Sequence, residues 1–209
     1  MNMQIIAHRG FWQSPEEKNT DIAFKRAIEL DFGIETDLRD LNGKLVISHD
    51  SPTGGELSFE NFMERFGART KNLAVNIKSD GLSKKFELAL ADYDSHGIVF
   101  FDMSGPEHFL YRKAGLRTLN RVSEFEKGFE FEIPDYGTWL DGFESDEWRI
   151  RWLEHNQTTP NIYIVSPELH GRDHLEFWES IRGLEGFHNF LLCTDFPVEA
   201  RHFFGADRD

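Results

Sequence analysis

Short apolar segments alternate with longer amphipathic segments along the whole chain. Apolar runs of strand length predict β-strands, whereas apolar residues that recur with helical spacing predict helices. The expected strands cover residues 3–7, 33–38, 44–48, 73–77, 98–101, 116–120, 138–140, 162–165 and 190–193. The expected helices cover residues 22–30, 58–66, 83–93, 106–114, 123–127, 145–155, 173–182 and 197–204. Asn19-Thr20, Ser58 and Ser145 are the expected N-caps of three of these helices.

The alternation of strands and helices predicts how the strands are arranged. Residues 44–48 follow Asn42-Gly43, a dipeptide typical of tight hairpins, so this segment should pair back onto the strand before it. The remaining segments form eight strand–helix units. Strands separated by helices pair in parallel through right-handed crossovers. The sequence therefore predicts an α/β fold, a small (β/α)8 TIM barrel in a single domain over residues 1–209.

Two carboxylates lie on one face of the second expected strand. Glu35 and Asp37 are two positions apart, and side chains with that spacing point to the same side of a strand. Carboxylates placed side by side on a buried face repel each other and are costly to desolvate, and a divalent cation relieves both costs. Oxygen ligands of this kind suit Mg²⁺ and Ca²⁺. The alternative is a solvated strand that carries two surface acids.

The barrel prediction can be checked at the carboxyl ends of the strands, where active sites of this fold are built. Polar and ionisable residues recur at those ends, while the strand bodies are apolar. They are His8, Arg9, Glu35, Asp37, Asn76, Lys78, Asp102, Asn120, Arg121, Asp141, Glu168 and Asp195. Each of the aspartates at 102, 141 and 195 could equally be a helix cap or loop residue. The recurrence at every strand end still favours one functional rim.

Composition narrows the classes of partner. The chain has 209 residues with a net charge of -14 and a pI of about 5.0, which argues against nucleic acid and anionic membranes as partners. A small phosphorylated substrate remains compatible, because a few local cations can form a positive pocket.

Cys193 is the only cysteine and lies in an apolar run, so a buried thiol is expected. The 20 phenylalanines predict an aromatic core. No signal peptide or transmembrane segment is recognisable, so a cytoplasmic location is expected. The oligomeric state is left open.

The polar rim resembles that of a known family. The matching motifs are His8-Arg9-Gly10, Asn19-Thr20, Glu35-x-Asp37, His49-Asp50, Ile77-Lys78 and Thr194-Asp195-Phe196-Pro197. In order and spacing they resemble the glycerophosphodiester phosphodiesterase family of the phospholipase C-like superfamily. Similar arrangements occur in sphingomyelinase D toxins and, more loosely, in phosphoinositide phospholipases C. The match over the first fifty residues is strong, whereas between residues 80 and 190 it is mainly architectural.

The resemblance implies metal-dependent cleavage of a small phosphodiester. His8 and His49 would act as general acid and base. Glu35 and Asp37 would hold a divalent metal, Mg²⁺ or Ca²⁺, that polarises a phosphate oxygen. Arg9 and Lys78 would bind the phosphate. Attack on the phosphorus would come from water or from a neighbouring substrate hydroxyl. Attack by the substrate hydroxyl would give a cyclic phosphate.

The chain departs from the family pattern in two places besides its short length. The family usually has a carboxylate two residues before the lysine, and Asn76 stands there; its amide oxygen can coordinate a hard cation but brings no charge. Only residues 51–56 separate Asp50 from the next helix, where many members carry an insertion over the glycerol group. These departures favour a bulkier phosphodiester, or a noncatalytic barrel that binds a phosphorylated ligand or a protein partner.

Overall fold

The strands pair in one continuous order. The computed structural model describes residues 3–128, 135–157 and 159–205. Its strands are β1 (Gln4–His8), β2 (Gly33–Leu41), β3 (Lys44–Ile47), β4 (Leu73–Ile77), β5 (Ile98–Phe101), β6 (Leu119–Val122), β7 (Gly137–Leu140), β8 (Ile162–Val165) and β9 (Leu191–Thr194). They follow the order β5-β4-β2-β1-β9-β8-β7-β6, with β3 paired to β2 off this path. A parallel bridge between Phe100 and Thr118 links β5 to the residue before β6. This is the strand order of the expected (β/α)8 barrel.

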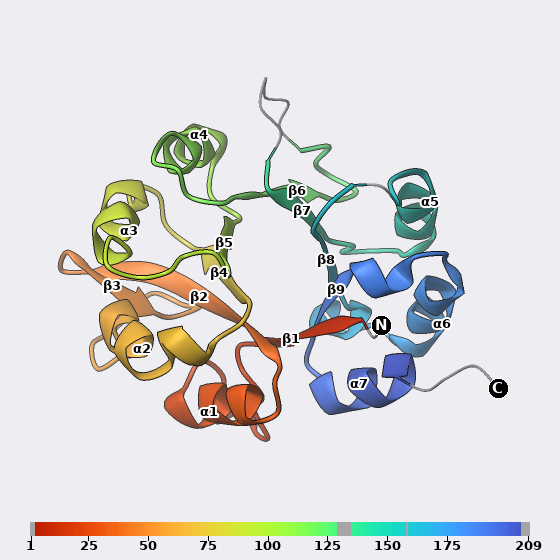
Figure 1. Cartoon of the computed structure of the whole chain (residues 1–209), viewed down its shortest axis with the longest axis horizontal. Helices are drawn as coiled ribbons and strands as arrows, with labels where there is room; N and C mark the ends of the chain where they lie inside the picture. Colours follow the sequence, from red (N-terminus) through yellow and green to blue (C-terminus); the bar gives the residue numbers. More distant parts are fainter. Residues whose placement is uncertain (1–2, 129–134, 158, 206–209) are drawn as a thin grey trace. The chain divides into compact units, whose positions relative to one another are not determined.

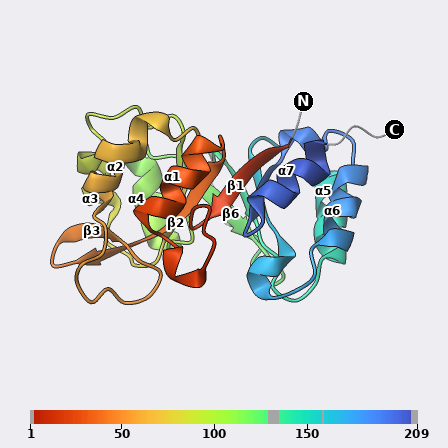
Figure 2. The same ribbon diagram turned by 90° about the horizontal axis from the view of Figure 1, so that it is seen from below.

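The chain divides into two compact units. The N-terminal unit, Ala7–Thr118, contains β2 to β5, and the C-terminal unit, Leu119–Asp209 together with Met1–Ile6, contains β6 to β9. The helices are α1 (Asp21–Glu29), α2 (Phe59–Phe66), α3 (Ser83–Ala89), α4 (Gly105–Lys113), α5 (Glu147–His155), α6 (Leu175–Gly183) and α7 (Pro197–Gly205). Within each unit the helices pack along the strands (Figure 1). The β2–β3 hairpin extends beyond α2 and α3 (Figure 2).

Aromatic rings fill the core of the N-terminal unit, as the phenylalanine content predicted. Phe24 meets Phe62 edge to face at a centroid separation of 5.0 Å. Phe86 packs on Phe100 at 4.8 Å and on Tyr111 at 5.8 Å. These five side chains are at most 1% exposed. The aromatic cluster therefore anchors α1 to α4 against the strands that carry the polar rim. Cys193 is also buried, in β9, as expected.

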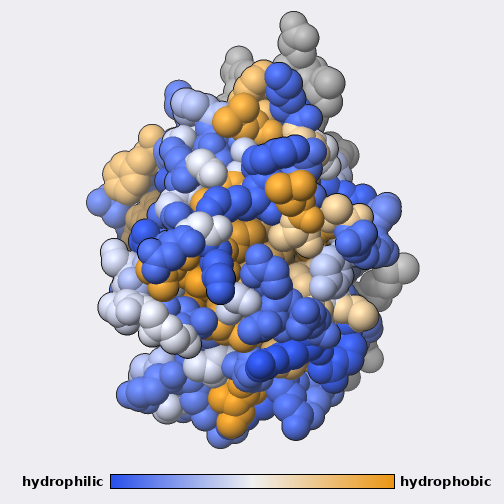
Figure 3. All heavy atoms as spheres, turned by 90° about the vertical axis from the view of Figure 1, so that its left-hand side faces the viewer, coloured by the Kyte–Doolittle hydropathy of each residue, from blue (hydrophilic) through white to orange (hydrophobic). Residues whose placement is uncertain are grey.

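The surface over α2, α3 and the β3 hairpin is mixed. Figure 3 shows apolar side chains on this side as separate patches among polar ones. The exposed apolar residues of α3 and α4 include Leu88, Phe109 and Leu110. Scattered exposed apolar residues are ordinary on a solvated surface. None of the described helices combines the length and the apolar composition needed to cross a bilayer.

One expected helix is absent from the described structure: residues 123–127 form a loop. The Ser123 backbone N–H donates to the Glu126 carbonyl, and the Ser123 hydroxyl accepts from the Phe125 N–H, a pattern that closes a turn instead of a helix. The Glu124 carboxylate accepts hydrogen bonds from three consecutive backbone N–H groups, at residues 143, 144 and 145. Contacts distant in sequence therefore override the local helical pattern. The remainder of this connection, residues 129–134, lies outside the described residues.

Several element boundaries also differ from the expectation. The strand expected at residues 116–120 is displaced to β6, and the helix expected at residues 83–93 ends at Ala89.

Ser145 is not the cap of α5, because the helix begins at Glu147 and the Ser145 N–H is bound by Glu124. Thr20 occupies the N-cap position of α1, but its hydroxyl donates to the Glu17 carbonyl instead of capping the helix. Ser58 does cap α2, accepting from the Asn61 N–H at 3.1 Å.

The pH dependence of the stability of the protein tests the hydrogen bonds that the Glu124 carboxylate accepts. Burial opposes ionisation of this carboxylate, but its backbone hydrogen bonds outweigh that effect and lower its pKa to about 2 from 4.5. A depressed carboxyl pKa contributes stability above the unfolded pKa, and the contribution is lost as the pH falls toward about 2. Glu124→Gln should therefore be less stable than wild type at pH 7, and the difference should shrink as the pH falls from 4.5 to 2. Urea unfolding across this range measures it.

The matched control for this experiment is Glu185→Gln, which neutralises an exposed carboxylate of the same unit. It should unfold like wild type at every pH. A constant difference between Glu124→Gln and wild type from pH 7 down to pH 2 would contradict the assigned role of the Glu124 charge.

Candidate active site

The β2 strand buries two carboxylates side by side. Successive side chains of a strand point to opposite faces, so Glu35 and Asp37 lie on one face of β2 and Thr36 on the other. Glu35 is 2% exposed and Asp37 is 1% exposed. The alternative of a solvated acidic strand is therefore wrong. The strand continues to Leu41 because β3 pairs with it in the hairpin register Leu38↔Ile47 to Leu41↔Lys44.

Two cations compensate Asp37. Arg9 Nε lies 2.9 Å from Asp37 Oδ2, and Lys78 Nζ lies 3.3 Å from Asp37 Oδ1. Burial opposes ionisation of Asp37, but the charges of Arg9 and Lys78 outweigh that effect and lower the pKa of this carboxyl. Asp37 is therefore held as an anion inside the fold. Arg9 and Lys78 themselves remain partly exposed, so their cationic groups are accessible from solvent.

Glu35 has the opposite electrostatic character. Burial, followed by repulsion from Asp37, raises the pKa of Glu35 well above its usual range. Its Oε2 accepts a hydrogen bond from the Arg9 backbone N–H at 3.2 Å and lies 3.8 Å from His8 Nε2. A buried carboxyl with a raised pKa beside a second carboxylate is a common feature of functional sites.

The turn after β1 brings Arg9 over β2. Arg9 has φ of 57° and Gly10 has φ of 79°, both in the left-handed region. A Cβ added to Gly10 would lie 2.8 Å from the Ala23 carbonyl carbon, so only glycine fits where this turn crosses α1. The His8-Arg9-Gly10 motif therefore has a structural basis: it turns the chain sharply enough to set Arg9 against Asp37.

Asn19 orients Asp37 from the loop before α1. Its Nδ2 donates to Asp37 Oδ2 at 2.9 Å, and its Oδ1 accepts from the Thr36 hydroxyl at 2.8 Å. Asn19 holds a left-handed backbone with φ of 60° and donates its N–H to the Arg9 carbonyl at 3.0 Å. The sequence marked Asn19 as part of a motif and an expected cap, and the structure shows that it positions a site carboxylate.

Arg39 is a second positioning residue, and the sequence prediction missed it. Its Nε donates to the His49 carbonyl at 3.0 Å, and its Nη1 donates to the Lys78 carbonyl at 3.1 Å. Arg39 thus ties the loops after β3 and β4 to β2. Its position two residues after Asp37, and therefore on the same strand face, was the signal that could have identified it.

The two candidate histidines occupy different environments. His8, at the end of β1, is 14% exposed and adjoins Glu35. His49 is 45% exposed, and its Nδ1 lies 2.8 Å from Asp50 Oδ1. His49 and Arg9 line one cavity of about 620 Å³, between the loop before α1 and the loop before α2. All seven predicted site residues lie within the N-terminal unit.

The oxygen atoms of the site fit a hard cation. Asp37 and Asn76 are register partners on the adjacent strands β2 and β4. Asn76 Oδ1 is buried and accepts no hydrogen bond from the described residues, whereas the buried Asp37 Oδ1 has an ion pair with Lys78 Nζ at 3.3 Å. An unsatisfied buried acceptor such as Asn76 Oδ1 is costly, and a cation would relieve that cost. The described residues contain no group of three His, Cys, Asp or Glu side chains placed to hold a metal ion.

Asn76 allows a test of metal binding that does not depend on activity. Asn76→Asp keeps the side-chain shape and adds a negative charge, and ligand charge tightens binding of hard cations. We expect Mg²⁺ to bind this variant at least ~10-fold more tightly than wild type in the absence of substrate. Calorimetric titration of Mg²⁺ measures the two affinities.

The control adds the same charge elsewhere: Asn61→Asp, on the exposed side of α2, should bind Mg²⁺ as wild type does. Equal affinities of the folded Asn76→Asp protein and wild type would exclude Asn76 as a metal ligand.

Two solved structures share this fold. A glycerophosphodiester phosphodiesterase from Agrobacterium tumefaciens superposes with a TM-score of 0.65 at 14% identity, covering 93% of this chain and 97% of that one. A glycerophosphoryl diester phosphodiesterase from Parabacteroides distasonis has a TM-score of 0.66 at 13% identity, covering 98% of this chain and 86% of that one. No protein-family model matches the sequence, and no curated protein is significantly similar to it. The likeness shows the (β/α)8 fold of these phosphodiesterases.

Proposed function

We propose that this chain is a metal-dependent phosphodiesterase of the glycerophosphodiester phosphodiesterase type. The observation that carries the proposal is the buried pair Glu35 and Asp37, contacted by Arg9 and Lys78 and adjoined by His8. A purely structural site would not need two desolvated carboxylates on one strand face. The shared fold with two phosphodiesterases supports the same conclusion.

The charges of the site suit a phosphodiester once a metal is bound. Two carboxylates, Glu35 and Asp37, are balanced by two cations, Arg9 and Lys78. Glu35, Asp37 and Asn76 would hold a divalent cation, which supplies Lewis-acid stabilisation of a phosphate oxygen. The pocket would then be positive overall and would attract a phosphodiester monoanion.

Arg9 and Lys78 would bind the phosphate oxygens. Arg9 uses Nε for Asp37, and its Nη groups carry the donors that form forked hydrogen bonds to phosphate. Lys78 adds a compact charge directly after the neighbouring strand β4. Because Asp37 already orients both side chains, little conformational freedom is lost when substrate binds.

His8 and His49 would move the protons. The Nδ1 of His49 faces the Asp50 carboxylate at 2.8 Å, which leaves Nε2 as the atom that exchanges a proton with substrate. His8 Nε2 lies 3.8 Å from Glu35, so an ionised Glu35 would stabilise the protonated imidazole. One histidine would protonate the leaving alcohol and the other would deprotonate the attacking hydroxyl or water.

Hydrolysis assays test this proposal. The purified chain with Mg²⁺ or Ca²⁺ should hydrolyse bis(4-nitrophenyl) phosphate and a glycerophosphodiester such as glycerophosphocholine. Phosphorus NMR of the products distinguishes attack by water, which yields a phosphomonoester, from attack by a substrate hydroxyl, which yields a cyclic phosphate. If neither compound is cleaved at any metal concentration, the proposal is overturned in favour of a noncatalytic barrel.

A further inference from the structure

The C-terminal unit carries a second cluster of side chains that the proposed reaction does not use. Phe125 follows β6, Asp141 and Phe143 follow β7, and His170 follows β8. Phe143 lies 5.8 Å from Phe125 and 4.7 Å from His170 between ring centroids. We call these four side chains the ring cluster. The carboxyl ends of parallel strands are where this fold presents ligand-binding residues.

The histidine of the ring cluster has a defined orientation. His170 Nε2 lies 2.7 Å from Asp141 Oδ1, and Asp141 is 6% exposed. A buried carboxylate at this distance accepts the Nε2 proton, and in this tautomer the ring lone pair is at Nδ1. No described residue hydrogen-bonds to that nitrogen. His170 is 23% exposed, so Nδ1 can accept a hydrogen bond from a ligand donor.

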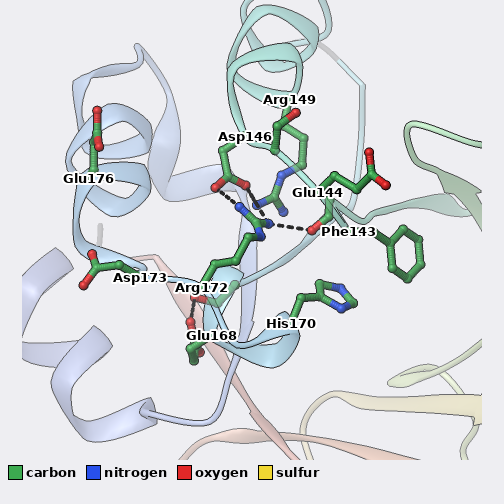
Figure 4. A network of polar contacts seen from close by, with 12 residues as sticks. Phe143, Glu144, Asp146, Arg149, Glu168, His170, Arg172, Asp173 and Glu176 are labelled. Carbon is green, nitrogen blue, oxygen red and sulfur yellow. Dashed lines mark hydrogen bonds and ion pairs between the residues drawn. The ribbon is translucent and has the colours of Figure 1, made fainter.

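Three loops hold the ring cluster in place. Glu124 binds the backbone N–H groups of residues 143 to 145 and so joins the loop after β6 to the loop after β7. Arg172 reaches from the loop after β8 to Asp146 and donates to the Gly142 carbonyl at 2.6 Å (Figure 4). Rings fixed by such contacts can bind a ligand with little loss of conformational freedom.

The apolar part of the cluster is open to solvent. Phe125 is 68% exposed, the largest exposed fraction among the exposed large apolar residues of the described chain. Its ring is tilted by 40° to Phe143, and Phe143 is tilted by 49° to His170. The three rings therefore offer an apolar face that ends at a hydrogen-bond acceptor. A ligand that covers this face needs an apolar surface on one side and a hydroxyl donor at its edge.

Charge limits the class of ligand. The segments 123–128, 141–146 and 166–173 contain seven carboxylates and two cations, which disfavours an anion. Several carboxylates are already bound: Glu124 by backbone N–H groups, Asp146 by Arg149 and Arg172, and Glu168 by the Asp195 N–H at 3.1 Å. A neutral ligand therefore meets less unfavourable electrostatics than an anion and satisfies the open acceptor at His170.

We propose that the ring cluster binds a neutral sugar ring. The apolar face of a pyranose would cover Phe125 and Phe143, and one hydroxyl would donate to His170 Nδ1. Asp141 is a positioning residue that fixes the histidine tautomer. This site lies within the C-terminal unit, and its occupancy does not depend on phosphodiester cleavage.

Titration of wild type with methyl glycosides tests the proposal by a readout independent of activity. Methyl α-mannopyranoside, methyl β-glucopyranoside and methyl β-galactopyranoside serve as probes, followed by protein NMR. We expect at least one to bind with a Kd of roughly 1–10 mM and to shift the His170 and Phe143 resonances. Absence of saturation by all three at about 50 mM would overturn the proposal.

Three variants locate the binding. Phe125→Ala, at an exposed position, should weaken binding by at least ~5-fold, and His170→Phe should do the same while keeping a ring against Phe143. Phe109→Ala removes a ring that is 56% exposed on α4 and should bind as wild type does. Wild-type affinity in Phe125→Ala would overturn the proposal even if His170→Phe failed to fold. Tighter binding of tetramethylammonium than of every glycoside would overturn it in favour of a cationic ligand.

Discussion

Replacing His8 or His49 with alanine is expected to lower kcat for a glycerophosphodiester by ~10²- to 10⁴-fold, the usual contribution of a positioned proton donor or acceptor. Both variants should fold, because His49 is 45% exposed and His8 lies at the carboxyl end of β1, outside the apolar core. Steady-state kinetics with a poor leaving group measures the loss. Because an activated aryl leaving group needs little protonation, the variant that removes the general acid should lose less activity on bis(4-nitrophenyl) phosphate.

His96→Ala is the matched control for these two variants. His96 is an exposed histidine of the same unit, and its ring contacts Asp94 away from the candidate site residues. Its kcat should equal that of wild type. Near-normal turnover of both His8→Ala and His49→Ala on the poor leaving group would rule out their roles as acid and base.

Removal of divalent metal is expected to abolish phosphodiester hydrolysis, and Mg²⁺ or Ca²⁺ should restore it. The reason is electrostatic: without a metal, Asp37 already engages both Arg9 and Lys78, and no Lewis acid is present to polarise a phosphate oxygen. A metal that stabilises the developing charge lowers the activation barrier by several kcal/mol. Its removal should therefore lower the rate of hydrolysis by more than ~10³-fold. Rates after chelation and after stepwise addition of metal measure it.

Asp37→Asn should lose Mg²⁺ affinity by calorimetry and should lose activity in parallel. Asp40→Asn, three residues later on the same strand and exposed, is the control and should keep both. Full activity in a metal-stripped sample would show that the carboxylate pair serves some purpose other than metal binding.

The local sequence was sufficient to predict the strands that carry the site. Alternation along β2 placed Glu35 and Asp37 on one face, and the structure confirms that both are buried. The hairpin followed from Asn42-Gly43, because a short turn of this composition determines its own geometry. The sequence of strands and helices predicted the barrel, since parallel strands joined by helices have few allowed arrangements. In each case the information lies within a few neighbouring residues.

Other features depended on contacts between residues far apart in the chain. The expected helix at residues 123–127 is a loop because Glu124 binds backbone groups about twenty residues later. Arg39 positions His49 and Lys78 through their carbonyl groups, which carry no side-chain signal. The pairing of Asp141 with His170 spans 29 residues. Local propensity determined which segments become strands in this protein, whereas tertiary hydrogen bonds decided which polar side chains meet, because those bonds form only after the segments pack.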